Sequence, residues 1–130
     1  MRPPAAEAAA IDAARASGTD LPPLAGAPYA VKNLFDLTGL TTVAGSKIER
    51  DRPAATADAY LVERMQAAGA ICVGALNMDE YAYGFTTENA HDGPCHNPHD
   101  LARSAGGRSR SIFEPAIVTT SSRSNRFLTA

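Results

Sequence analysis

The fold of this chain is decided by residues 56–76, which read TADAYLVERMQAAGAICVGAL. Apolar residues recur at helical spacing in the first part of this stretch, which predicts a helix over 56–70 with Thr56 as its N-cap and Gly69 at its end. The apolar positions are Ala59, Leu61, Val62, Met65 and Ala68. The apolar residues are then continuous over 70–76, which is typical of a strand covered on both faces.

A second strand is predicted upstream, over residues 29–35, where the sequence reads YAVKNLF. An alanine-rich segment over 4–16 precedes it and predicts a helix that ends at Ser17-Gly18. Glycine and proline punctuate residues 36–55, which indicates a loop with little regular structure. The order strand, loop, helix, strand favours a parallel pair of strands, so we expect an α/β fold.

The composition is that of an ordinary globular domain. Of the 130 residues, 45% are hydrophobic and 20% are charged, and the net charge is −2. This balance offers no general attraction to nucleic acid or to an anionic membrane. No stretch resembles a signal peptide or approaches the ~20 apolar residues that span a bilayer, and two cysteines make no disulfide framework. We therefore expect a cytoplasmic protein with no nucleic-acid or membrane partner.

Lys32 is the first candidate site residue, because it stands inside the apolar run of the upstream strand. Lysine is seldom fully buried unless it is paired or functional. In one interpretation its stem lies along the strand end and its amine reaches solvent. In the other, burial lowers the pKa of the amine by ~3–5 units, so that it serves as a general base for a neighbouring hydroxyl. The residue pattern leaves both interpretations open.

The second candidate is a cluster that holds every histidine of the protein within nine residues. Its members are His91, Cys95, His96 and His99. Imidazole and thiolate are zinc ligands, but Cys95 and His96 are adjacent and converge poorly on one ion, and no second ligand pair stands elsewhere. We therefore expect no metal and no cofactor here, and a polar loop whose histidines bond to backbone groups. Cys72, in the second strand, is predicted to be a small core residue.

The composition changes abruptly after Gly107. All ten glycines lie at or before this residue, whereas residues 108–130 carry four arginines, one glutamate and five serines. Such a change marks a different kind of segment. We expect a domain over 1–107 and a divergent tail over 108–130 that is disordered or non-native.

Three stretches taken together resemble the amidase signature family. They read PLAGAPYAVKNLFDLTGLTTVAGSKI, DAYLVERMQAAGAICVGALNMDEYAYGFTTENA and GPCHNPHDLARSAGG, in the family's order. The likeness is greatest to bacterial amidohydrolases related to biuret and allophanate hydrolysis. It runs from about Ala10 to Gly107 and covers well under half of a full member. The resemblance therefore implies an N-terminal fragment, in which 1–107 forms an incomplete part of the family's mixed sheet flanked by helices.

The resemblance also implies an activity, the hydrolysis of linear C–N amide bonds by a Ser–cis-Ser–Lys triad. The lysine of the family's VKN motif falls on Lys32, which implies that Lys32 is the general base. Tyr83 and Gly84 match family sequence that borders the substrate pocket. The implied substrate is a small amide, and no cofactor or metal is implied.

The sequence departs from the family where the cis-serine is expected. The family's Gly-Ser-rich stretch begins here with Gly106-Gly107, but Arg108 stands at the cis-Ser position. A guanidinium does not give up its proton in proteins and cannot relay one. Ser109 aligns with the second serine of the stretch, and no later glycine shapes a turn for the nucleophile, so Ser121, Ser122 and Ser124 have no such setting.

We therefore expect a truncated product, of a frameshift or a shortened gene copy, that has no amidase activity by itself. The alternative is a non-catalytic binding or assembly module that a second chain complements. An incomplete sheet would expose apolar surface, so we also expect a homo-oligomer or an aggregate.

Overall fold

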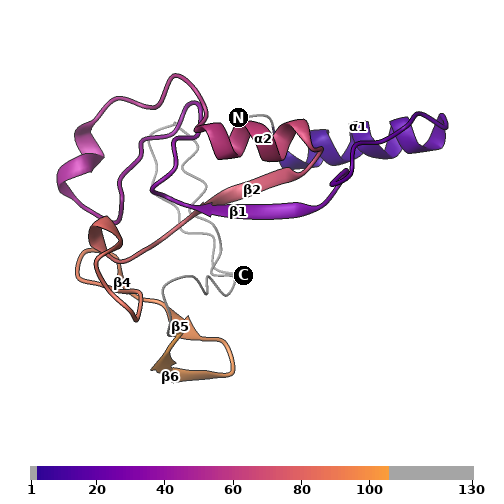
Figure 1. Cartoon of the computed structure of the whole chain (residues 1–130). Helices are drawn as coiled ribbons and strands as arrows, with labels where there is room; N and C mark the ends of the chain where they lie inside the picture. Colours follow the sequence, from indigo (N-terminus) through magenta and orange to yellow (C-terminus); the bar gives the residue numbers. More distant parts are fainter. Residues whose placement is uncertain (1–2, 106–130) are drawn as a thin grey trace.

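The computed structural model describes residues 3–105, and the predicted tail over 108–130 lies outside this range. Figure 1 shows a pair of strands beside two helices, with smaller elements gathered at the end away from the first helix. In chain order the elements are α1 (Pro4–Ala16), β1 (Pro28–Lys32), the 3-10 helix η1 (Ile48–Asp51), α2 (Tyr60–Ala67), β2 (Ile71–Leu76), the 3-10 helix η2 (Glu80–Ala82), β3 (Glu88–Asn89), β4 (Gly93–Pro94), β5 (His96–Asn97) and β6 (Asp100–Ser104). The predicted α/β fold is confirmed.

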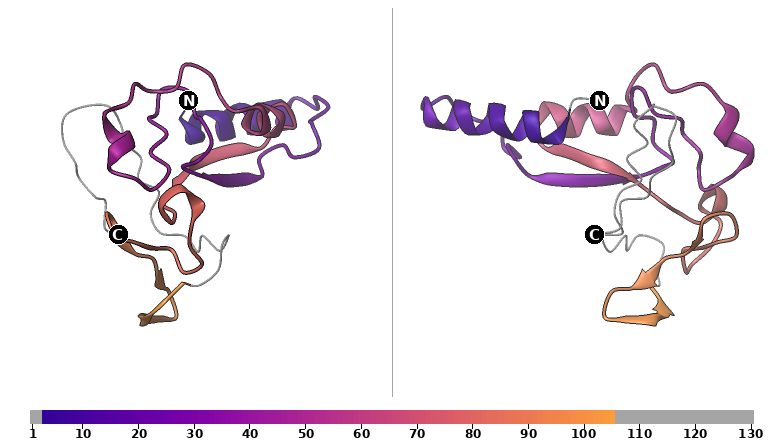
Figure 2. Two further views of the ribbon diagram at one scale, coloured as in Figure 1. Left: turned by 60° about the vertical axis from the view of Figure 1, so that its left-hand side comes forward. Right: turned by 180° about the vertical axis from the view of Figure 1, so that it is seen from behind.

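The parallel pair expected from the sequence is formed by β1 and β2. It runs from Pro28 opposite Ile71 to Lys32 opposite Leu76, and the register shifts after Tyr29. Both helices lie on the same side of this pair (Figures 1 and 2). Because the strands are parallel, the loops that follow them leave from the same end of the sheet. Lys32, the last residue of β1, lies at this carboxyl end.

The alanine-rich segment forms the predicted helix α1. Pro4 occupies its first turn, where a missing N–H removes no intrahelical bond. Ser17 is the C-cap, and Gly18 follows with a φ of +72°, a left-handed conformation that glycine adopts without steric cost. None of the residues of α1 is buried, so its alanines stabilise it through helix propensity more than through packing.

The first predicted strand is shorter and less buried than expected. It ends at Lys32 rather than Phe35, and its last four residues are half-buried. The chain turns because the Phe35 N–H donates to the Lys32 carbonyl oxygen over 3.1 Å. The N–H of Asn33 still bonds to β2, but its carbonyl oxygen turns away and accepts from the Ala44 N–H over 2.8 Å.

The second predicted helix begins later than expected, at Tyr60, so the prediction of Thr56 as its N-cap is wrong. Hydrogen bonds to the loop that follows β1 hold Asp58 and Ala59 out of the helix. The Thr38 N–H donates to Asp58 Oδ1 over 2.5 Å, and the Ala59 N–H donates to the Asp36 carbonyl oxygen over 2.9 Å. These contacts with distant residues take the place of a first helical turn. The predicted stop is confirmed, because Gly69 follows the C-cap of α2 with a φ of +88°.

The core lies between α2, β2 and the loop after β1. Its fully buried members are Leu37, Val62, Cys72 and Ala75. Cys72 is 2% exposed, which confirms it as a core residue, and most of β2 is buried as predicted. Of the predicted apolar face of α2, only Val62 is fully buried, and Leu61 is 57% exposed. The helix therefore covers β1 and β2 along a narrow line.

The region after β2 contains more regular structure than the predicted loop. The strands β3 and β4 form one short antiparallel hairpin, and β5 and β6 form another. Within residues 3–105, none of the helices has the length and apolar character needed to cross a membrane.

Candidate active site

Lys32 is one of the residues that line a hollow of about 240 Å³ between β1 and α2. The side chains around it are mostly apolar. They belong to Tyr29, Ala30, Val31, Lys32, Phe35, Leu61, Val62 and Met65. Lys32 is half-buried, which falls between the two interpretations of the sequence. Because Lys32 is among the lining residues, it can contact a molecule that enters the hollow.

Burial raises the pKa of two side chains in the paired strands, Tyr29 of β1 and Cys72 of β2. Burial, with smaller contributions from Cys72, raises the pKa of Tyr29 to about 12, and the Tyr29 hydroxyl donates to the Val62 carbonyl oxygen over 3.5 Å. Burial also raises the pKa of the Cys72 thiol. A thiol held in its protonated form is a poor nucleophile, so Cys72 is a packing residue and not a reactive one.

The strand end that carries Lys32 is fixed by its neighbour Asn33. The Asn33 N–H donates to the Leu76 carbonyl oxygen of β2 over 3.0 Å. The backbone oxygen of Asn33 accepts from the Ala44 N–H over 2.8 Å, and its Oδ1 accepts from the Val43 N–H over 3.2 Å. The strand end is therefore tied both to β2 and to the loop 43–46.

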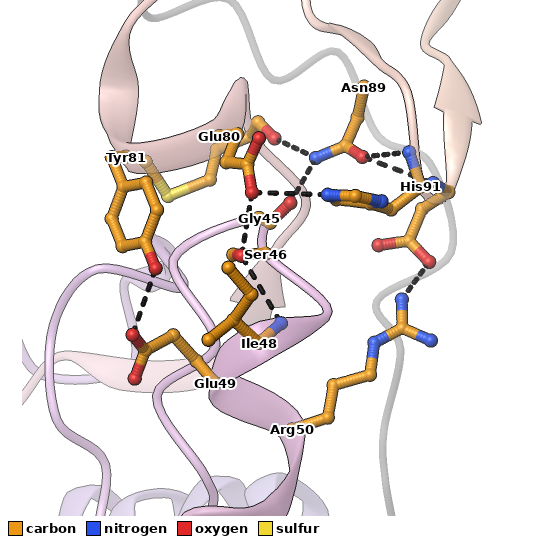
Figure 3. Close-up of polar contacts among 11 residues, drawn as sticks. Gly45, Ser46, Ile48, Glu49, Arg50, Glu80, Tyr81, Asn89 and His91 are labelled. Carbon is orange, nitrogen blue, oxygen red and sulfur yellow. Dashed lines mark hydrogen bonds and ion pairs between the residues drawn. The ribbon is translucent and has the colours of Figure 1, made fainter.

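A polar cluster joins this loop to the segments that follow β2. In Figure 3 the Glu80 carboxylate stands between the side chains of Ser46 and His91. Its Oε1 accepts from Ser46 Oγ over 2.6 Å and lies 3.1 Å from His91 Nε2. These hydrogen bonds, first the one from Ser46 and then the one from His91, hold the pKa of Glu80 below its ordinary value of 4.5. Because one oxygen accepts both contacts, Ser46 is bonded to the carboxylate and not to the imidazole, an arrangement unlike that of a serine activated by histidine.

Asn89 joins three segments of this cluster through its side chain. Its Nδ2 donates to the Gly45 carbonyl oxygen over 2.6 Å and to the Met78 carbonyl oxygen over 2.7 Å. Its Oδ1 accepts from the N–H groups of His91, at 2.7 Å, and Asp92, at 3.1 Å. The side chain therefore uses both of its donors and both acceptor positions, as a buried amide requires.

Exposed ion pairs surround the cluster. Arg50 pairs with Asp92, and the Tyr81 hydroxyl donates to Glu49 Oε1 over 2.9 Å (Figure 3). Arg52 pairs with Glu49 Oε2 over 2.7 Å, and this contact, followed by that of Tyr81, lowers the pKa of Glu49. Pairs so exposed are screened by solvent and contribute little to stability.

Tyr83 and Gly84, the predicted pocket residues, lie in the segment after η2. Tyr83 is 95% exposed, and neither residue is among those that line the hollow beside Lys32. Gly84 packs closely on the Asp79 side chain, which would have to shift for a larger residue, because a Cβ at position 84 would stand 2.5 Å from Asp79 Cγ. The described residues thus place Lys32 and the Tyr83-Gly84 segment in different environments.

The histidine and cysteine cluster is dispersed over the two hairpins. Cys95 is buried, at 5% exposure, and the His91 ring contacts the Glu80 carboxylate instead of the expected backbone group. Across residues 3–105, no group of three or more histidine, cysteine, aspartate or glutamate side chains is arranged to hold a metal ion. Nor do the two cysteines form a disulfide in this part of the chain.

The described part of the site therefore offers one amine beside an apolar hollow and a separate polar network. Arg108, Ser109 and the serines of the tail lie outside the described residues. The sequence indicated Lys32, because a lysine within an apolar run is unusual. It held no sign of the Ser46, Glu80 and Asn89 network, since each of these contacts spans at least 11 residues and follows no local spacing.

Comparison with known proteins places these features in a family. The family model described as Amidase matches residues 3–109. AtzE of Pseudomonas sp. strain ADP, which is named as part of a 1-carboxybiuret hydrolase, is 68% identical over 104 residues, which cover 80% of this chain and 23% of AtzE. A glutamyl-tRNA(Gln) amidotransferase subunit of Anaeromyxobacter dehalogenans is 51% identical over 105 residues, which cover 80% of this chain and 21% of the relative.

Solved structures agree with this placement. A structure of a vestigial protein complex linked to the origins of an s-triazine catabolic enzyme matches with a TM-score of 0.76 and 67% identity, over 81% of this chain and 23% of the other. The peptide amidase of Stenotrophomonas maltophilia matches with a TM-score of 0.67 and 32% identity, over 81% of this chain and 22% of the other. The chain spans about a fifth to a quarter of the length of these relatives. It belongs to the Amidase family.

Proposed function

We propose that this chain carries the general-base lysine of an enzyme that hydrolyses linear amide bonds, and that Lys32 is that lysine. The observation that carries the proposal is the place of Lys32 in the family's VKN motif, at the carboxyl end of β1 and in the lining of an apolar hollow. A lysine amine placed beside a serine hydroxyl can act as the general base that activates the hydroxyl. Tyr83 and Gly84 are proposed to border the substrate pocket.

The proposed substrate is a small amide, and no cofactor takes part in the proposed reaction. AtzE is named as a subunit of a 1-carboxybiuret hydrolase, which supports a small amide substrate. The net charge of −2 fits a protein that binds neither nucleic acid nor anionic membranes, and we propose that it acts in the cytoplasm.

We further propose that the 130-residue chain has no amidase activity by itself. Arg108 stands where the cis-serine is expected, and a guanidinium cannot relay a proton to Lys32. A reading-frame change after Gly107 would produce this departure. Sequencing of the encoding DNA tests this origin, because a frame that restores a Gly-Ser-rich motif is expected after Gly107.

A second candidate function is that of an assembly module that a second chain completes. The apolar hollow beside Lys32 favours it, because such a surface is suited to packing against protein. The names of AtzE and of the amidotransferase relative both describe subunits, which supports a partner chain.

The deciding experiment measures hydrolysis of simple amides and biuret-like compounds by the purified chain, alone and with the remaining sequence of AtzE supplied as a separate chain. We expect turnover only in the mixture. Lys32→Ala should lower that turnover by about 10²–10⁴-fold, the range for loss of a general base. Lys47→Ala is the matched control, because Lys47 is the only other lysine of the sequence and is exposed. Turnover by the chain alone would overturn the proposed inactivity, and turnover unaffected by Lys32→Ala would exclude Lys32 as the base.

A further inference from the structure

We propose that Asn89 is a positioning residue, whose side chain sets where the segment carrying Tyr83 and Gly84 stands relative to the strand end carrying Lys32. The proposed function supplies the roles of Lys32, Tyr83 and Gly84, and the inference rests on it. The hydrogen bonds of the Asn89 side chain go to backbone groups of other residues, so Asn89 acts on these three through the chain.

The first step is the clamp between two loops. Asn89 is 4% exposed, and its Nδ2 donates to carbonyl oxygens of two segments distant in sequence, Gly45 at 2.6 Å and Met78 at 2.7 Å. Figure 3 shows the amide of Asn89 beside Gly45 and Glu80. The clamp therefore holds the start of the segment 78–84 against the loop 43–46.

The second step leads from this loop to Lys32. The Ala44 N–H donates to the carbonyl oxygen of Asn33, the neighbour of Lys32, over 2.8 Å. The Ala44 carbonyl oxygen in turn accepts from the Tyr81 N–H, also over 2.8 Å. Ala44 is therefore hydrogen-bonded both to the strand end that carries Lys32 and to the segment 78–84. The Asn89 side chain adds a further hydrogen bond to the loop 43–46 at the next residue, Gly45.

Backbone conformation at both sides of the contact indicates that it is imposed by its surroundings. Three non-glycine residues here have left-handed φ values, namely Ala44 at 46°, Tyr81 at 50° and Ala82 at 62°. Such conformations persist only where the surrounding structure holds them, and they gather at functional sites. Ala44 and Tyr81 are the two residues that the clamp brings together.

The close approach of the two loops also explains a glycine. Gly45 has a φ of +70°, and a Cβ there would stand 2.5 Å from the Met78 carbonyl oxygen and 2.8 Å from Asn89 Nδ2. A side chain at this position would push the two loops apart. Gly45 and Asn89 are thus two independent points at which the clamp can be opened.

The test compares hydrogen exchange of individual amides in the full chain. Asn89→Asp has nearly the same shape and keeps its acceptors, but at neutral pH it cannot donate to the two carbonyl oxygens. We expect the protection factor of the Tyr81 amide to fall at least about tenfold, the equivalent of one net hydrogen bond, while the amides of β2 stay unchanged. Acidification should restore part of the protection in this variant, because a protonated carboxyl group can donate one hydrogen bond again. The wild-type chain at the same pH values controls for Glu80, His91 and Asp92.

Gly45→Ala opens the clamp from the other side and should expose the Tyr81 amide in the same way, without recovery in acid. Asn97→Asp is the matched control, because Oδ1 of Asn97 accepts from the His99 N–H within one exposed hairpin and joins no distant segments. It should leave the Tyr81 amide unchanged. Unchanged exchange at Tyr81 in Asn89→Asp would overturn the proposal. So would a loss of protection across all of β2 in both variants, since Asn89 would then support the whole fold and not one segment.

This readout does not depend on turnover, so the two proposals can fail separately. Lys32→Ala should leave the Tyr81 amide protected even where it abolishes hydrolysis. If Lys32→Ala left the turnover of the mixture with the remaining AtzE sequence unchanged, the proposed function would be wrong. The hydrogen-exchange data would still show whether Asn89 holds the segment 78–84 against the loop 43–46.

Discussion

Tyr29 lies in β1 with its ring packed against the core and its hydroxyl 3.5 Å from the Val62 carbonyl oxygen. Burial raises its pKa from 10.0 to about 12, so the folded chain favours the neutral phenol. The stability that this provides is fully present below pH 10 and is lost as the pH rises through about 12, because the unfolded chain releases the proton first. We expect the free energy of unfolding, measured in urea between pH 9 and 12, to fall more steeply in the wild type than in Tyr29→Phe.

Tyr83→Phe provides the control for this prediction, since it makes the same chemical change at a residue that is 95% exposed. Its stability should follow the wild-type curve over the whole range. Parallel curves for the wild type and Tyr29→Phe would show that the Tyr29 phenol gains nothing from its burial, in contradiction to the prediction.

The packing of α2 on the two long strands depends on Leu37, which is 2% exposed and belongs to the same buried group as Val62 and Cys72. Leu37→Ala removes several buried methyl and methylene groups and leaves a cavity among them. We expect a loss of about 2–5 kcal/mol in the free energy of unfolding, measured by urea denaturation. Leu101→Ala is the control, because Leu101 in β6 is 71% exposed and should change stability by no more than about 0.5 kcal/mol. Equal losses in the free energy of unfolding for the two substitutions would show that Leu37 does not belong to the stabilising core.

The same elements show what local sequence can predict. Helix α1 and strand β2 were predictable because alanine propensity and a continuous apolar run act within the segment itself. The start of α2 was not, since Asp58 accepts from the Thr38 N–H, 20 residues away, and this contact displaces the predicted cap. Asn89 was equally hidden, because it donates to Gly45, 44 residues away. Lys32 stood out only because its neighbours are apolar.

The described residues leave several large apolar side chains in contact with solvent. The long sheet has two strands, and both helices lie on one side of it (Figures 1 and 2). Exposed apolar side chains lie on α2, where Tyr60 is 70% and Leu61 57% exposed, and Leu61 also lines the hollow beside Lys32. Parallel strands are usually covered on both faces, and two strands alone are seldom stable.

We therefore expect the wild-type chain to bind a fluorescent hydrophobic dye and to sediment as species larger than a monomer, because burying this surface against another molecule is favourable. Leu61→Ser should weaken both effects, since it removes an apolar side chain from the lining of the hollow. Leu101→Ser should weaken neither, because Leu101 is at least as exposed but lies in the β5–β6 hairpin, away from the hollow. A monomer that melts in one sharp cooperative transition without binding dye would contradict the prediction, and would mean that the surface on α2 is already covered.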